Sequence, residues 1–134
     1  MNITPEYITE LKPNEVFVFG SNESGRHGRG AARDALKFGA KYGQANGMQG
    51  RTYAIPTVNS SISDALSLAK IKYWVDIFVE HVKNNPDKIF MVTPIGCGLA
   101  GYRPKQIAPL FKECVKLENV YLPKSFLHKL GEKI

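Results

Sequence analysis

The sequence has few of the residues that hold small proteins together through covalent or metal bonds. Its two cysteines, Cys97 and Cys114, cannot form a disulfide framework, and its three histidines are scattered along the chain. No group of cysteines and histidines has the spacing of a zinc site. We therefore expect no metal and no bound cofactor. We also expect the 134 residues to fold as a single domain, residues 1–134, which is long enough to bury its own core.

Long apolar runs are also missing. No stretch approaches the roughly 20 consecutive apolar residues that cross a bilayer. The N-terminal segment "MNITPEYITELKP" has no basic start followed by an apolar region, as a secretory signal would have. These absences predict a cytoplasmic protein without a membrane partner.

Acidic residues are outnumbered by basic ones, 12 against 18, so the formal net charge is +6. Most lysines are spread along the expected helices and the C-terminal tail, as on an ordinary solvated surface. The compact basic cluster is Arg26, Arg29 and Arg33, and it lies within a glycine-rich stretch. This balance favours an anionic partner. Nucleic acid is the alternative to a small ligand, although the chain shows no known nucleic-acid-binding motif.

The apolar pattern predicts alternating strands and helices. Short apolar runs predict strands over 15–19, 52–55, 89–92 and 119–123, the second of them closed by Pro56. Helical spacing predicts one helix from Gly30, a long helix that begins after Ser63 or Ser67 and buries Trp74, and a third helix from Pro104. The alternation is typical of an α/β fold whose mostly parallel central sheet is flanked by helices.

Two glycine-rich segments each follow a predicted strand and precede a predicted helix. The first glycine loop, "GSNESGRHGRGAA", covers residues 20–32, and the second glycine loop, "PIGCGLAGY", covers residues 94–102. Both are expected at the carboxyl edge of the sheet, where α/β proteins bind ligands. Glycines let backbone amides approach an anion closely. Neither segment has the "GK[ST]" of a P-loop or the dinucleotide "GxGxxG" followed by an acid, which disfavours a kinase or a nicotinamide dehydrogenase.

The segment "FGSNESGRHGRGAARDALKFG" resembles the first ligand loop of macro domains, in which an asparagine precedes the glycines that open a helix. "MVTPIGCGLAGY" is similar to the second loop of that family. "IGCGL" and "HGRGAA" look most like the branch of terminal ADP-ribose glycohydrolases, and the chain also resembles small stand-alone bacterial and phage proteins of this type. The resemblance implies a three-layer α/β/α macro-domain-like fold with a cleft for ADP-ribose or a related nucleotide.

On this resemblance, Asn22 would bond the distal ribose, the amides of 28–31 and 96–101 would hold the diphosphate, and Tyr102 would pack on the sugar. From the residues alone, Asn22 could instead cap a turn, and Tyr102 could be an ordinary half-buried aromatic residue. The residues of the two loops and the resemblance together predict these ligand-binding residues: Gly20, Ser21, Asn22, Arg26, His27, Gly28, Arg29, Gly30, Ala31, Thr57, Ile95, Gly96, Cys97, Gly98, Leu99, Ala100, Gly101 and Tyr102.

Catalytic side chains of the family are absent from the matching positions. The lysine of the glycohydrolase branch falls on Thr57 and its aspartate on Ala100, while the aspartate of another branch falls on Ala32. Asn22 and His27 remain as catalytic candidates, and a dyad of His27 with Cys97 would require the two loops to meet. We expect recognition of ADP-ribose or a derivative, free or attached to protein or nucleic acid. Whether the chain also hydrolyses such a ligand stays open.

Overall fold

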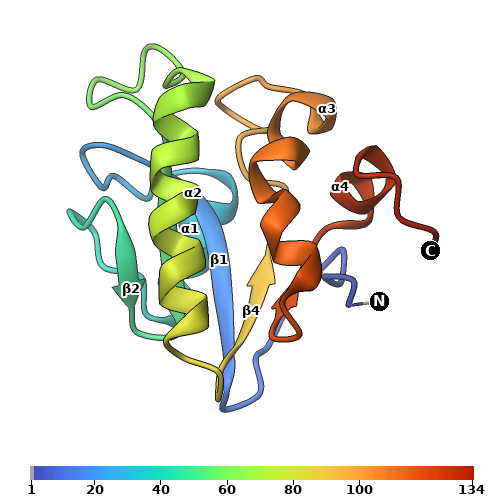
Figure 1. Cartoon of the computed structure of the whole chain (residues 1–134). Helices are drawn as coiled ribbons and strands as arrows, with labels where there is room; N and C mark the ends of the chain where they lie inside the picture. The colour runs from blue at the N-terminus through green and yellow to red at the C-terminus, as the bar shows by residue number, and fades with distance from the viewer. Residues whose placement is uncertain (1) are drawn as a thin grey trace.

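A five-stranded, mostly parallel sheet forms the centre of the molecule (Figure 1). The computed structural model describes residues 2–134. The strands have the order β2-β3-β1-β4-β5, so β1 is central. β1 pairs in parallel with β3 and β4, β4 pairs in parallel with β5, and β2 is antiparallel to β3. The strands are β1 Glu15–Asn22, β2 Gly47–Gln49, β3 Thr52–Val58, β4 Ile89–Val92 and β5 Val120–Tyr121.

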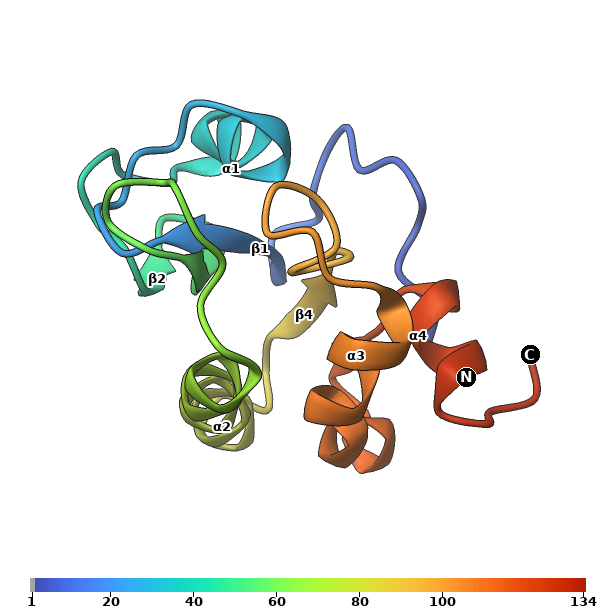
Figure 2. The same ribbon diagram turned by 90° about the horizontal axis from the view of Figure 1, so that it is seen from above.

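Helices cover both faces of this sheet. Seen from above, α1 lies on one side of the strands, and α2 and α3 lie on the other (Figure 2). The helices are α1 Gly30–Ala35, the 3-10 helix η1 Leu36–Phe38, α2 Leu68–Lys83, α3 Pro104–Ile107, the 3-10 helix η2 Ala108–Lys116 and α4 Lys124–Lys129. Within residues 2–134, no helix is both long enough and apolar enough to cross a membrane.

The central strand serves both layers because successive side chains of a strand point to opposite faces. Val16 and Val18 belong to the larger buried cluster, which packs beneath α2, α3, η2 and α4. Phe17 and Phe19 belong to a smaller cluster beneath α1 and η1. A strand that is buried on both faces has apolar residues at successive positions. This explains why the apolar run over residues 15–19 predicted a strand.

The long helix α2 begins where a serine can cap it. Ser67 Oγ accepts a hydrogen bond from the Lys70 amide at 3.1 Å, so Ser67 is the cap and Ser63 is not. The buried stripe of α2 centres on Phe78, whose ring contacts those of Tyr53 and Phe90 at centroid distances of 5.1 and 5.7 Å. Trp74 lies half-buried at the edge of the same cluster. The other buried residues of the stripe are Ile71, Val75, Val79 and Val82.

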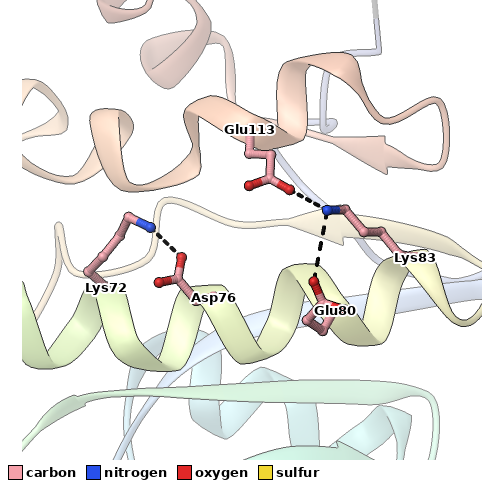
Figure 3. Close-up of polar contacts among 5 residues, drawn as sticks. All are labelled: Lys72, Asp76, Glu80, Lys83 and Glu113. Atoms are coloured by element: carbon pink, nitrogen blue, oxygen red, sulfur yellow. Dashed lines mark hydrogen bonds and ion pairs between the residues drawn. The ribbon is translucent and has the colours of Figure 1, made fainter.

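At the surface, the ion pair of Lys83 with Glu113 joins α2 to η2, and two further pairs lie within α2 (Figure 3). Lys83 Nζ lies 2.5 Å from Glu113 Oε2 and 3.9 Å from Glu80 Oε1, and Lys72 pairs with Asp76 one turn along α2. The hydrogen bond to Glu113 raises the pKa of Lys83 above its ordinary value. All of these side chains are exposed, so solvent and salt weaken the pairs and the buried stripe carries the packing of α2.

The structure confirms the predicted α/β class with helices on both faces, and it corrects several boundaries. Pro56 does not end its strand, because β3 continues to Val58 and pairs with β1 up to that residue. On the other side, β2 pairs only with residues 52–54, so no strand there needs an amide donor from Pro56. β1 likewise extends through Asn22, beyond the predicted end at 19. The hairpin strand β2 and the terminal helix α4 were not predicted.

Candidate functional site

A cavity of about 730 Å³ lies at the carboxyl ends of β3, β1 and β4. Figure 2 looks onto this end of the sheet, where the segments that follow these strands come together. Both glycine loops line the cavity, and so does the β3–α2 loop (residues 59–67). The lining residues are Gly20, Ser21, Asn22, Arg26, Gly28, Arg29, Gly30, Ala31, Ala32, Tyr42, Thr57, Val58, Ile62, Thr93, Pro94, Ile95, Gly96, Gly98, Leu99 and Ala100.

Asn22 closes the first glycine loop on itself. Its Oδ1 accepts from the Arg26 amide at 2.9 Å and from Ser24 Oγ at 2.8 Å, and its Nδ2 donates to the Arg26 carbonyl at 2.7 Å. Asn22 is therefore a turn-forming residue in this structure, with its side chain almost fully buried. It also lines the cavity, and the second hydrogen on Nδ2 has no partner among the described residues.

Arg26 connects the first glycine loop to the β3–α2 loop. Its Nη2 donates to the Ser60 carbonyl at 3.0 Å, and its Nε donates to Ser24 Oγ at 3.2 Å. The ion pair between Glu23 and Lys70, 2.7 Å long, ties the same loop to the first turn of α2. These contacts fix the position of the first glycine loop relative to the wall above β3.

His27 supports the first glycine loop from beneath and is not among the cavity-lining residues. It is 1% exposed, its ring packs against those of Phe19 and Tyr42, and its Nε2 lies 3.3 Å from Gln49 Oε1. The sequence predicted a contact between this imidazole and the ligand. The structure turns the side chain inward, because the loop places it over the apolar face of β1.

The second glycine loop is closed by backbone hydrogen bonds. The Tyr102 amide donates to the Gly96 carbonyl and the Gly101 amide donates to the Gly98 carbonyl, both at 2.9 Å. Tyr102 Oη donates to the Leu66 carbonyl at 2.6 Å, and this bond holds the ring against the core. Cys97 is half-buried, and burial raises the pKa of its thiol. Tyr102, Gly101 and Cys97 are thus outside the lining in this structure.

The glycines of the two loops differ in whether the fold requires them. Gly96 is required by the fold: it has φ +79°, and a Cβ there would lie 2.7 Å from Ile107 Cδ1. Gly28 and Gly98 do not have a left-handed backbone, and apart from their chain neighbours no residue described has an atom within 4 Å of an added Cβ. Both line the cavity, one from each loop. Nothing within the chain requires glycine at these two positions.

The charge in the cavity is positive. Arg26 and Arg29 are the charged residues of the lining, which contains no carboxylate among the residues described. Arg29 makes no ion pair or side-chain hydrogen bond within residues 2–134, so its guanidinium is available to an anion. Across the same residues, no three histidine, cysteine, aspartate or glutamate side chains are grouped as they would be around a metal ion.

Several lining residues were not predicted as ligand contacts. Ala32, Val58, Thr93 and Pro94 directly extend predicted segments and could have been included on that ground. Tyr42 and Ile62 come from separate loops, and no local pattern connects them to the glycine loops. An isolated large apolar residue in a polar stretch was the available signal, as in "NSSISD" around Ile62.

Comparisons with known proteins give one structural likeness and no sequence match. No protein-family model matches the chain, and no curated protein matches it. A solved structure of DarTG from Thermosipho africanus in complex with ADP-ribose superposes with a TM-score of 0.58 at 22% identity. The match covers 90% of this chain and 39% of that chain, so this chain spans well under half of that protein. At this identity the likeness shows the fold alone, and that fold is the macro-domain-like α/β/α arrangement that the sequence resemblance implied.

Proposed function

We propose that this protein binds ADP-ribose, or a nucleotide derived from it, in the cavity between the two glycine loops. The observation that carries the proposal is the pair Gly28 and Gly98. Neither the backbone conformation nor a close neighbour within the described chain requires glycine at these two positions. The two residues line the cavity from opposite loops. Glycine at such positions is explained when a ligand approaches the backbone closely.

The chemistry of the lining fits a sugar nucleotide with a diphosphate. Arg26 and Arg29 supply positive charge, and guanidinium groups bind phosphate through several hydrogen bonds at once. Tyr42, Ile62 and Leu99 add apolar surface against which sugars or a base can pack. The volume lies within the about 300–1,000 Å³ that is typical of small-ligand sites. The DarTG structure, which contains ADP-ribose, supports this ligand class.

Within this proposal, the predicted residues act in two ways. The Gly28–Ala31 backbone and the backbones of Gly96 and Gly98–Ala100 face the diphosphate, and the free hydrogen on Asn22 Nδ2 bonds the distal ribose. His27, Cys97, Gly101 and Tyr102 shape the loops without direct contact. The charged groups nearest the ligand are arginines, which do not exchange protons at neutral pH. We therefore propose recognition as the activity of the site, without acid–base hydrolysis.

Calorimetric titration with ADP-ribose tests the proposal. We expect saturable binding, and a dissociation constant above about 1 mM, equivalent to about −4 kcal/mol, would refute it. Arg29→Ala should weaken binding because it removes a cation from the lining. Arg33→Ala removes the same charge from α1 outside the lining and is the matched control. Release of ADP-ribose from an ADP-ribosylated protein or nucleic acid by the wild-type chain would show that the site also catalyses.

A further inference from the structure

The β3–α2 loop holds one residue in an unfavourable backbone conformation. Among residues 2–134, Ile62 is the non-glycine residue with positive φ, at +58°. A left-handed backbone is costly for a β-branched side chain, which crowds the neighbouring carbonyl groups. Such a conformation persists only where the surroundings enforce it, and it is concentrated at functional sites.

Hydrogen bonds around Asn59 enforce this conformation. Asn59 Oδ1 accepts from the Ser63 amide at 3.0 Å and the Asp64 amide at 3.3 Å, while the Ile62 amide donates to the Asn59 carbonyl at 3.1 Å. The bond from Arg26 Nη2 to Ser60 holds the loop from the opposite side. The loop is thus a closed ring with Ile62 near its tip.

The same ring places Ile62 in the cavity lining. Its sequence neighbours Ser60, Ser61, Ser63 and Asp64 are polar, so Ile62 is the isolated large apolar residue of this loop. Asn22 lies opposite Val58 in the register of β1 and β3, just before the loop starts. The wall that contains Ile62 therefore stands over β3, beside Asn22, while the space between the two glycine loops lies over β1 and β4.

We propose that Ile62 is a specificity-determining contact that packs on the terminal ribose of a nucleoside diphosphate sugar. This inference rests on the proposed function, because it requires the diphosphate to lie between the glycine loops. Among the residues described, β3 and the β3–α2 loop contribute Thr57, Val58 and Ile62 to the lining, and none of these is an aromatic side chain on which a base would stack. We therefore place the sugar attached to the second phosphate, rather than the base, against this wall. The strained loop presents a rigid aliphatic surface to one face of that sugar, and the free hydrogen on Asn22 Nδ2 donates to one of its hydroxyl groups.

Two substitutions at one position test the proposal with two ligands. Ile62→Asn keeps a side chain that tolerates a left-handed backbone but removes the aliphatic surface, and Ile62→Leu keeps that surface. ADP-ribose and ADP differ by the terminal ribose. We expect Ile62→Asn to weaken ADP-ribose binding by about tenfold, as at an interface contact of moderate strength. Binding of ADP should not change, and Ile62→Leu should stay near the wild-type affinity for both ligands.

The outcomes separate this inference from the proposed function. Equal loss of ADP and ADP-ribose binding in Ile62→Asn would overturn the assignment to the terminal ribose. Wild-type affinity of Ile62→Asn for both ligands, with a lowered thermal midpoint, would give Ile62 a purely structural role and also overturn it. Failure of the wild-type chain to bind either ligand would refute the proposed function, and this inference with it.

Discussion

Replacing Gly98 by alanine adds one methyl group to the wall of the cavity and changes nothing inside the protein. Apart from Gly98 itself and its two chain neighbours, no residue described has an atom within 4 Å of the added Cβ, and the backbone of Gly98 is not left-handed. Alanine at such a position reduces the freedom of the unfolded chain and raises stability by about 0.4–1 kcal/mol. For a domain of this length, this corresponds to a thermal midpoint about 1–4 °C higher.

The same methyl group should weaken ligand binding if the ligand touches this stretch of backbone. Forcing an extra methyl into a packed contact costs about 1–3 kcal/mol, which raises the dissociation constant for ADP-ribose about 5- to 150-fold. Gly28→Ala should behave in the same way from the opposite loop. The expected signature is a protein that is slightly more stable but binds more weakly.

Scanning calorimetry and titration calorimetry on the same preparations measure both effects. Gly96→Ala is the contrasting control, since its Cβ would lie 2.7 Å from Ile107 Cδ1 and its φ is +79°. That variant should lose stability whether or not a ligand binds. Wild-type ADP-ribose affinity in both Gly98→Ala and Gly28→Ala would refute the argument that the ligand approaches these two backbones.

Two further predictions concern the scaffold. Phe78→Ala should lower the unfolding free energy by about 3–5 kcal/mol in denaturant titration, because the fully buried ring is the centre of the aromatic cluster, whereas Tyr73→Ala on the exposed side of α2 should change it by less than about 0.5 kcal/mol. Burial and the charge of Lys88 lower the pKa of His81 below its ordinary value of 6.5, so below that pH the unfolded chain takes up a proton that the folded chain resists. Stability should therefore fall as the pH drops from 7.5 to 5.5, and His81→Phe should reduce this fall in thermal scans; an equal fall in both proteins would contradict the assignment.

Much of the fold could be predicted because its determinants are local in the chain. The strand over 89–92 is a continuous apolar run, and the spacing of Ile71, Val75 and Phe78 indicated the long helix. The strand β2 has three residues and the helix α4 has six. Segments this short show too little periodicity for the sequence to predict them. The strand end predicted at Pro56 was wrong, because a strand can contain proline where no neighbouring strand needs its amide as a donor. Whether β2 extends as far as Pro56 is decided by the assembled sheet and not by the local sequence.

The site was predictable where the backbone forms it and less so where side chains do. Gly28 and Gly98 lie in the cavity wall. Their placement could be predicted because each loop directly follows a strand whose position in the sheet the sequence indicates. The directions of His27 and Tyr102 depend on how each loop turns, and tertiary contacts with Gln49 and Leu66 decide them. Ile62 reaches the cavity through a hydrogen-bonded ring that no periodic pattern reveals.

The two faces of the sheet give the cavity one well-supported wall and one thinly supported wall. In the part of the chain described, the buried residues of the cluster beneath α1 are three phenylalanines and four alanines. The second glycine loop instead rests on the much larger cluster that contains Ile107. Local opening should therefore cost least on the α1 side. A ligand that contacts both loops would link α1 to the side of the sheet with the larger cluster and so make local opening of α1 less favourable. Slower amide hydrogen exchange in α1 would therefore report ligand binding.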